Sequence, residues 1–309
     1  MKAIVQHEFG GPETLQVAEV DSPTPGAGEV VVKVTASTVN PLDTLIREGK
    51  ALKEFTPLPF IPGWDVAGTV AEVGEGAPFE PGQRVFGMPR FPKPGKALAE
   101  YCVVDARNLA ATPDSLSDAE AAALPMAGMT AWQAFHDTVE VKEGEKVLIN
   151  GAGGGVGHLA VQIAAAAGAT ITAIASPSKH EWLRSLGAHE VVDYNDEAAM
   201  AALEGFTTAF NLAPGSWVPT LEAVAPGGHL ITISGGADEL NERAEEAGIH
   251  HHVTSVNTRD EWLAALVDLV EGGKLRPHIS ATYPLERAAD AHRELDEGHA
   301  QGKIVITIG

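Results

Sequence analysis

The chain has 309 residues, and its 42 acidic and 21 basic residues give a formal net charge of −21 at pH 7. This length is sufficient for two domains, and the acidic balance argues against nucleic acids and anionic membrane surfaces as partners. A single cysteine, Cys102, rules out an intramolecular disulfide framework.

The N-terminal segment, MKAIVQHEFG, has no apolar core behind its lysine. It therefore does not resemble a secretory signal peptide, and no apolar run elsewhere is long enough to span a membrane. We expect no membrane association and, by default, a cytoplasmic location.

Residues 1 to about 120 are rich in Gly, Pro and Val, and Pro/Gly turn signals separate short apolar runs. This pattern is typical of an all-β, barrel-like domain. The expected strands are residues 3–6, 30–34, 66–73, 83–86 and 99–104. The pattern becomes helical over residues 117–134.

A strand, a glycine-rich turn, a helix and a second strand come next. They are expected at residues 146–150, 151–157, 156–167 and 171–175. Such a unit binds a dinucleotide, because the turn lets backbone approach the pyrophosphate and the helix N-terminus offers N–H groups.

The glycine turn, GAGGGVG, departs slightly from G-x-G-x-x-G. In the best register Ala152 replaces the first glycine, and Gly154 and Gly157 occupy the other two positions. We expect Gly154, Gly155 and Val156 to contact the cofactor.

The end of the second strand indicates which dinucleotide binds. Chains that prefer NAD carry Asp or Glu there, about 20 residues beyond the glycines, to bind the ribose hydroxyls. This chain has Ser176-Pro177-Ser178-Lys179. Because the hydroxyls can bind a 2′-phosphate and Lys179 can neutralise it, we expect NADPH, held by Ser176 and Lys179. The alternative is that Lys179 is an ordinary solvated residue that opens the next helix.

Strands and helices continue to alternate downstream. Further strands are expected at residues 190–194, 207–212, 229–234 and 249–256, and a helix at 258–271. Six parallel strands with intervening helices form a doubly wound sheet. A final strand, residues 303–308, is expected to pack on the N-terminal domain, which makes the cofactor domain an insertion with a cleft between the domains.

Segments spread over the chain carry a family pattern. They are VNPLDTLIREG (39–49), IPGWDVAGTV (61–70), GQRVFG (82–87), AAALPMAGMTAW (121–132), the glycine turn and GKIVITI (302–308). Together they resemble the medium-chain dehydrogenase/reductase superfamily, specifically its zinc-independent NADPH:quinone oxidoreductase-like branch. The resemblance covers essentially the whole chain. It implies a GroES-like β-barrel catalytic domain (residues 1–122 and 257–309) and a Rossmann domain (residues 123–256).

Zinc-dependent relatives carry a catalytic Cys, a Gly-His-Glu segment and a lobe with four closely spaced Cys. This chain has Asn40 and Gly63-Trp64-Asp65 in the first two places, and one Cys in all. Zinc requires three or four N, S or O ligands. In a strand, His251 points away from His250 and His252, so the triplet is expected at the surface and cleft edge. We expect no metal.

The resemblance also implies catalytic residues. Asn40 and Asp43 are expected to line the cleft, with Asn40 near the cofactor and substrate, and Thr130 is expected to contact the nicotinamide end. On the residues alone, Asn40-Pro41 can form a turn, Asp43 can cap the following helix, and Thr130 can be a helix-face hydroxyl.

Further cofactor contacts are expected where strands end. Tyr194 resembles a residue that holds the adenosine phosphate, and its alternative is a core aromatic. Residues at the ends of later strands would lie beside the ribose or nicotinamide, because ligands bind at carboxyl ends of such sheets. They are Asn211, Leu212, Ile233 and Ser234. Their alternative is that they only end strands.

Without zinc, hydride transfer to an activated acceptor is easier than reduction of a simple ketone. A quinone or an α,β-unsaturated carbonyl delocalises the incoming charge onto oxygen, so modest hydrogen-bond donors suffice. We expect an NADPH-dependent reductase of a small quinone or enone. Leu45 stands where some relatives have a tyrosine donor, so the sequence indicates no catalytic acid and leaves the proton donor open, with water as one source. Two alternatives stay open: an enoyl reductase for a polyketide-like or thioester substrate, and an NADPH-binding structural or redox-sensing protein with little turnover. The resemblance also implies a homodimer.

Overall fold

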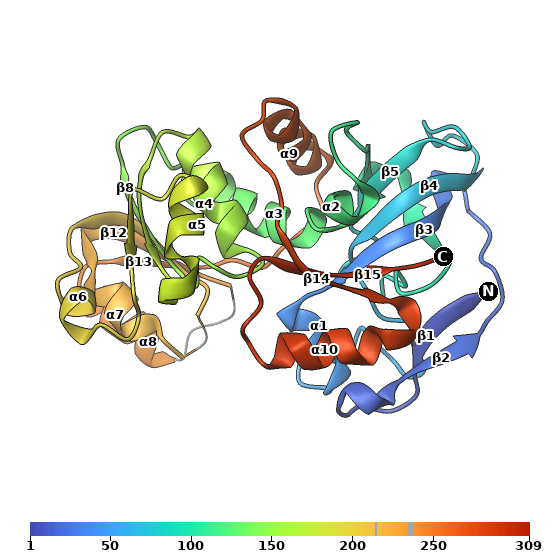
Figure 1. Ribbon diagram of the computed structural model, residues 1–309, viewed down its shortest axis with the longest axis horizontal. Coiled ribbons are helices and arrows are strands. Elements are labelled where there is room, and N and C mark those ends of the chain that lie inside the picture. Colours follow the sequence, from blue (N-terminus) through green and yellow to red (C-terminus); the bar gives the residue numbers. More distant parts are fainter. Residues whose placement is uncertain (214, 234–237) are drawn as a thin grey trace. The chain divides into compact units, whose positions relative to one another are not determined.

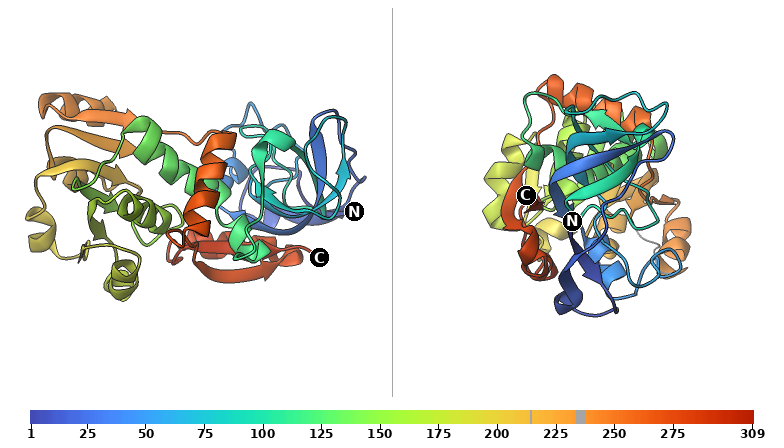
Figure 2. Two further views of the ribbon diagram at one scale, coloured as in Figure 1. Left: turned by 90° about the horizontal axis from the view of Figure 1, so that it is seen from above. Right: turned by 90° about the vertical axis from the view of Figure 1, so that its right-hand side faces the viewer.

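The computed structural model describes residues 1–213, 215–233 and 238–309. The chain forms two compact units (Figure 1). Unit 1 is Met1–Met126, Asn257–Glu271 and Arg276–Gly309, and unit 2 is Ala127–Val256 and Gly272–Leu275. Both chain ends belong to unit 1 (Figure 2). Among the helices of the described residues, none combines the length and apolar character of a membrane span.

Unit 2 is built on a six-stranded sheet in which every neighbouring pair is parallel. The strands are β8 (Lys146–Asn150), β9 (Thr170–Ile174), β10 (Glu190–Val192), β11 (Phe206–Asn211), β12 (Val224–Thr232) and β13 (His250–Val253). Their order, β10-β9-β8-β11-β12-β13, is that of the doubly wound dinucleotide-binding fold. The predicted Rossmann sheet is confirmed.

Helices cover both faces of this sheet, because the right-handed crossovers run in opposite directions from β8 (Figure 1). α4 (Gly157–Ala166) packs on β8 and β9, and α5 (His180–Ser185) packs on β10. α7 (Trp217–Glu222) packs on β11 and β12, and α8 (Asp238–Glu246) packs on β13. The other helices are α6 (Glu197–Ala201), α3 (Pro125–Trp132) and the π-helical turn Gln133–Thr138. Residues 147–150 of β8 are all buried, as expected for a central parallel strand.

Unit 1 is mostly β-structure. β1 (Lys2–Gln6) pairs with β2 (Leu15–Glu19). The larger sheet runs β14 (Ile279–Pro284), β15 (Lys303–Thr307), β3 (Glu29–Val39), β4 (Val66–Val73), β5 (Arg84–Gly87) and β7 (Leu109–Ala111), with β6 (Tyr101–Asp105) also on β3. The helices are α1 (Pro41–Arg47), α2 (Asp118–Ala122), α9 (Asp260–Glu271) and α10 (Ala288–Asp296). The C-terminal strand thus completes a sheet that begins near the N-terminus.

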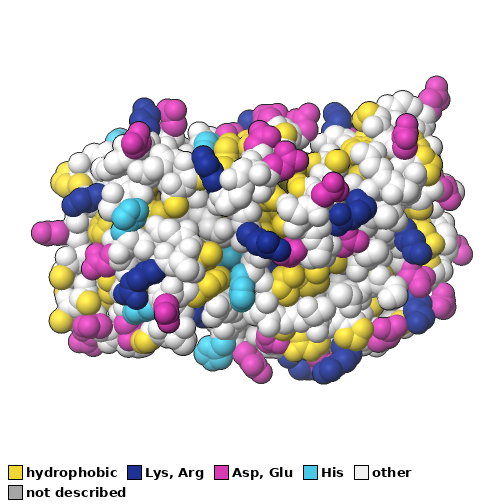
Figure 3. Space-filling model, turned by 45° about the horizontal axis from the view of Figure 1, so that its top comes forward, with side chains coloured by type: hydrophobic (Ala, Val, Ile, Leu, Met, Phe, Trp, Pro, Cys, Tyr) yellow, Lys and Arg dark blue, Asp and Glu magenta, His cyan; other side chains and the backbone are white. Residues whose placement is uncertain are grey.

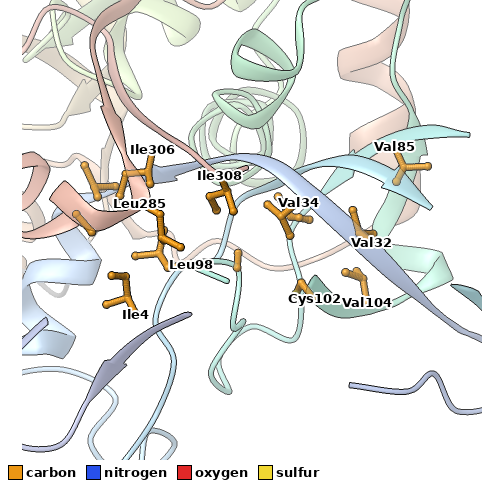
Figure 4. Packing of buried hydrophobic residues seen from close by; sticks show 14 of the residues in the cluster. Ile4, Val32, Val34, Val85, Leu98, Cys102, Val104, Leu285, Ile306 and Ile308 are labelled. Atoms are coloured by element: carbon orange, nitrogen blue, oxygen red, sulfur yellow. The ribbon is translucent and has the colours of Figure 1, made fainter. Parts of the chain in front are cut away.

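The core of unit 1 follows the two-residue period of its strands (Figure 4). Val32 and Val34 of β3 point into the same cluster as Ile304 and Ile306 of β15. Leu285, which follows β14, belongs to the same cluster.

Two of the differences between predicted and observed elements lie beside candidate site residues. The predicted helix 117–134 is broken into α2 and α3, because Pro125 lacks an N–H and opens a new helix at its first position. The strand predicted at residues 190–194 ends at Val192, so Tyr194 lies beyond it.

A buried cation links α1 to α10 in unit 1. The Arg47 guanidinium, 2% exposed, donates to Gly10 O and, at 3.0 Å, to Asp296 Oδ2. It also donates to His292 Nδ1 at 3.1 Å, which places the proton of the neutral ring on Nε2. Burial, and then the Arg47 charge, lowers the pKa of His292 from 6.5 to about 3.

We predict that replacing His292 by Gln flattens the acid dependence of stability. Because the pKa of His292 is lowered, the unfolded chain binds a proton between pH 6.5 and pH 3 that the folded chain excludes. The contribution of His292 to the free energy of unfolding is therefore fully present above pH 6.5 and is lost as the pH falls toward 3. Between pH 7 and pH 5 the free energy of unfolding should fall by about 2 kcal/mol more in the wild type than in His292→Gln. Urea denaturation followed by circular dichroism measures it. Exposed His299→Gln is the control, and equal slopes for His292→Gln and wild type would contradict the prediction.

Candidate functional site

The glycine turn joins β8 to α4 at the carboxyl end of β8. Gly151 has a φ of +80°, a conformation that favours glycine. A Cβ on Gly157 would lie 2.3 Å from Gly151 O and 2.6 Å from the Ala152 Cα, so only glycine allows the helix to begin this close to the turn. The buried His158 ring bonds Gly154 O at 2.9 Å through Nδ1, which fixes the turn from beneath.

The glycine turn has open space at Gly154, where a ligand could approach the backbone. A Cβ on Gly154 would approach only Gly151 O, at 3.5 Å, so packing within the chain does not require glycine there. Gly154, Gly155 and Val156 are half-buried, and α4 begins directly after them. The first turn of a helix presents N–H groups that have no partner within the helix, and these bind anions.

Lys179 lies against this turn. A Cβ on Gly153 would meet Lys179 Cδ at 2.4 Å, and the ammonium is 3.5 Å from Gly153 O. Partial burial lowers the pKa of Lys179. The Ser176 and Ser178 hydroxyls are 3.2 Å apart in the same segment, so two hydroxyls and a cation lie together after β9.

The remaining predicted cofactor residues lie at or near strand ends. Tyr194 is 56% exposed, so it is not a core aromatic. The Asn211 side chain accepts from Asn150 Nδ2 at 2.9 Å, which ties the ends of β11 and β8 together. Leu212 and Ile233 are half-buried directly after their strands, and Ser234 lies outside the described residues. Thr130 is buried on α3.

In unit 1, Asn40 and Asp43 form a capping box at the start of α1. The Asn40 N–H donates to Asp43 Oδ2 at 2.6 Å, and both residues are 4% exposed. Burial raises the pKa of Asp43 to about 7, and the nearby Asp65 charge adds to the shift. The capping role that the sequence left open for Asp43 is therefore present.

The Asn40 side chain belongs to a buried polar cluster. Its Nδ2 donates to Asp65 Oδ2 at 2.8 Å, and its Oδ1 accepts from Lys303 Nζ at 2.5 Å. Lys303 Nζ is 3.7 Å from Asp65 Oδ2, and the two side chains are 3% and 0% exposed. Sequence reasoning missed Asp65 and Lys303 as site residues. The available signals were an acidic residue inside IPGWDVAG and a lysine opening an otherwise apolar strand.

The histidine triplet lies on β13, with His251 bonding away from the other two. His252 Nε2 is 3.0 Å from His229 Nδ1, whereas His251 bonds Thr232 and Asn241. Within the described residues, no group of three or more His, Cys, Asp or Glu side chains is arranged to hold a metal ion.

Known proteins resemble the chain over its whole length. Residues 26–114 match the alcohol dehydrogenase GroES-like domain, and residues 186–306 match the zinc-binding dehydrogenase family. A chloroplast envelope quinone oxidoreductase homolog of Arabidopsis thaliana is 35% identical over 99% of this chain and 98% of its own length. Human quinone oxidoreductase is 33% identical over 100% and 98%, and an NADPH-dependent alkenal/one oxidoreductase of Arabidopsis thaliana is 32% identical over 99% and 79%.

Solved structures agree with these relatives. The quinone oxidoreductase of Coxiella burnetii has a TM-score of 0.93 and 31% identity over 100% of this chain and 99% of its own. A mycobacterial protein solved with NADPH has a TM-score of 0.89 and 27% identity over 99% and 100%. The chain therefore belongs to the medium-chain dehydrogenase/reductase superfamily, in its quinone oxidoreductase branch.

Proposed function

We propose that the chain is a zinc-independent, NADPH-dependent oxidoreductase that transfers hydride to a quinone or an α,β-unsaturated carbonyl. The carrying observation is the position of Lys179, which lies over the glycine turn where an NAD-preferring chain has a carboxylate. Residues 123–256 would bind the dinucleotide, and residues 1–122 and 257–309 would hold the substrate.

The described residues fit NADPH. The N-terminus of α4 and the open face at Gly154 suit a pyrophosphate, and Ser176 and Lys179 suit a 2′-phosphate. Two similar proteins support this cofactor, since one is named as NADPH-dependent and another was solved with NADPH. When bound, NADPH supplies the hydride.

Zinc independence is part of the proposal. Asn40 and Trp64 stand in the segments where zinc-dependent relatives carry Cys and His. The Trp64 indole is fully buried and donates from Nε1 to Lys93 O at 2.9 Å, so it fills its place as a packing residue. An acceptor that spreads charge onto its own oxygen suits a site that offers only hydrogen-bond donors.

Asn40, Asp43 and Thr130 are the proposed catalytic residues. Asn40 and Thr130 would orient the reactants through an amide and a hydroxyl. Asp43 can hold a proton near neutral pH, because burial raises its pKa to about 7. The proton would lie on Oδ1, which has no hydrogen-bond partner among the described residues, whereas Oδ2 accepts from the Asn40 N–H.

The names of similar proteins support both acceptor classes. Several are quinone oxidoreductases, and others are an alkenal/one oxidoreductase and a 2-methylene-furan-3-one reductase. An enoyl reductase would use the same residues and is the second candidate, because two relatives are named as an alkenal/one oxidoreductase and a 2-methylene-furan-3-one reductase.

A small molecule is the proposed partner, together with a second copy of the chain. Acidic side chains lie interspersed with Lys and Arg over the face shown in Figure 3, in keeping with the net charge of −21. β13 is an edge strand of the six-stranded sheet and is the proposed dimer contact.

The proposal is tested by following the oxidation of NADPH, and of NADH in parallel, with a quinone and several enones, each with and without a chelator. We expect turnover with NADPH, at least about tenfold higher kcat/KM than with NADH, that survives chelation. Loss of activity with the chelator would contradict zinc independence. Tight NADPH binding with no turnover on any acceptor would favour a binding or sensing role.

We predict that Lys179→Met weakens NADPH binding by about 10- to 100-fold, because it removes a charge-assisted contact to the 2′-phosphate. NADH affinity should change by less than about threefold, since NADH lacks that phosphate. Calorimetric titration of both cofactors measures the difference. Lys142→Met, at an exposed lysine of unit 2, is the matched control. Equal losses for the two cofactors would contradict the assignment.

A further inference from the structure

Asp65 is a carboxylate without exposure to water, and its partners come from separate segments of unit 1. Its Oδ2 accepts from the Thr38 hydroxyl and from Asn40 Nδ2, at the end of β3 and the start of α1. Its Oδ1 accepts from the Met126 N–H at 2.7 Å. Lys303, from β15, supplies the opposite charge.

This arrangement allows one orientation of the Asn40 amide. The Lys303 ammonium can only donate, and the Asp65 carboxylate accepts from its neighbours, so Oδ1 of Asn40 must face the ammonium and Nδ2 must face the carboxylate. If the amide were rotated by half a turn, Nδ2 would face the Lys303 ammonium, which is also a donor, and Oδ1 would face the Asp65 carboxylate, which is also an acceptor. Two buried charges thus fix the polarity of a proposed catalytic side chain.

The same carboxylate holds the start of α3. Pro125 has no N–H, so the Met126 N–H is the first donor of the helix, and a carboxylate at a helix N-terminus is stabilised by the helix dipole. α3 carries Thr130, and the chain passes from unit 1 to unit 2 within this helix.

We propose that Lys303 and Asp65 are positioning residues for the proposed reductase reaction: together they hold the Asn40 amide and the first turn of α3 in one arrangement. This inference rests on the proposed function. A buried ion pair costs desolvation that apolar residues of similar size avoid, so stability alone does not account for it. Burial lowers the pKa of Lys303, while the Asp65 and Asp43 charges act to keep it protonated.

The test compares Lys303→Met, Asp65→Asn and the double variant. Each single change leaves a buried charge without its partner and should lower Tm, whereas the double change removes both charges and should recover most of the loss.

If the pair acts only in stability, kcat recovers with Tm. If it positions Asn40 and α3, the double variant should keep a kcat about 10- to 100-fold below wild type, with KM for NADPH changed less than about threefold. Exposed Lys2→Met is the control. A double variant with wild-type Tm and kcat would overturn the proposal.

A second readout is independent of activity. In protein labelled with [15N]asparagine, the Asn40 side-chain amide is identified by its loss in Asn40→Asp. Its protons should exchange slowly with solvent in the wild type and much faster in the double variant. Unchanged exchange would overturn the positioning role. This measurement needs no substrate. If the protein reduces no acceptor, that result refutes the proposed function alone, and the exchange rates still test whether Lys303 and Asp65 position Asn40.

Discussion

All six strands of the unit 2 sheet run in one direction, and this constraint places the candidate cofactor residues. Parallel strands end at the same edge, so the glycine turn after β8, the Ser176–Lys179 segment after β9 and Asn211 at the end of β11 lie along one border. The contacts of Gly157 with Gly151 and of Lys179 with Gly153 then bring the turn and the cation together. The surface that we propose binds phosphate is therefore formed mainly by backbone.

The polar cluster of unit 1, in contrast, is formed by buried side chains. Its groups are side chains from distant segments, and each is almost fully buried. A buried carboxylate without donors would be costly, so Asp65 requires the Thr38, Asn40 and Met126 donors as well as Lys303. These requirements make the arrangement specific, since a shift of one segment leaves a charge unsatisfied.

Local patterns were sufficient to predict most of unit 2. The strand, turn and helix around Gly157 depend on neighbours in sequence, and Lys179 was found because it follows a strand by a few residues. The link between Asn40 and Lys303 could not be predicted, because the two residues are 263 positions apart and meet only through the pairing of β15 with β3. Element ends were also missed, as at Pro125 and Tyr194, where a helix start and a short strand pairing decide the boundary.

The pairing of β15 with β3 also orders events during synthesis. The chain leaves the ribosome from its N-terminus, so β3, β4 and β5 emerge long before β14 and β15, the last strands of their sheet. Residues 127–256, the main segment of unit 2, are complete in the meantime, and domains generally fold as units during synthesis. Until residue 303 emerges, the edge of β3 that receives β15 lacks its strand and Asp65 lacks its countercharge. During synthesis the sheet of unit 1 therefore stays open at β3 until β15 emerges, after the main segment of unit 2 has been made.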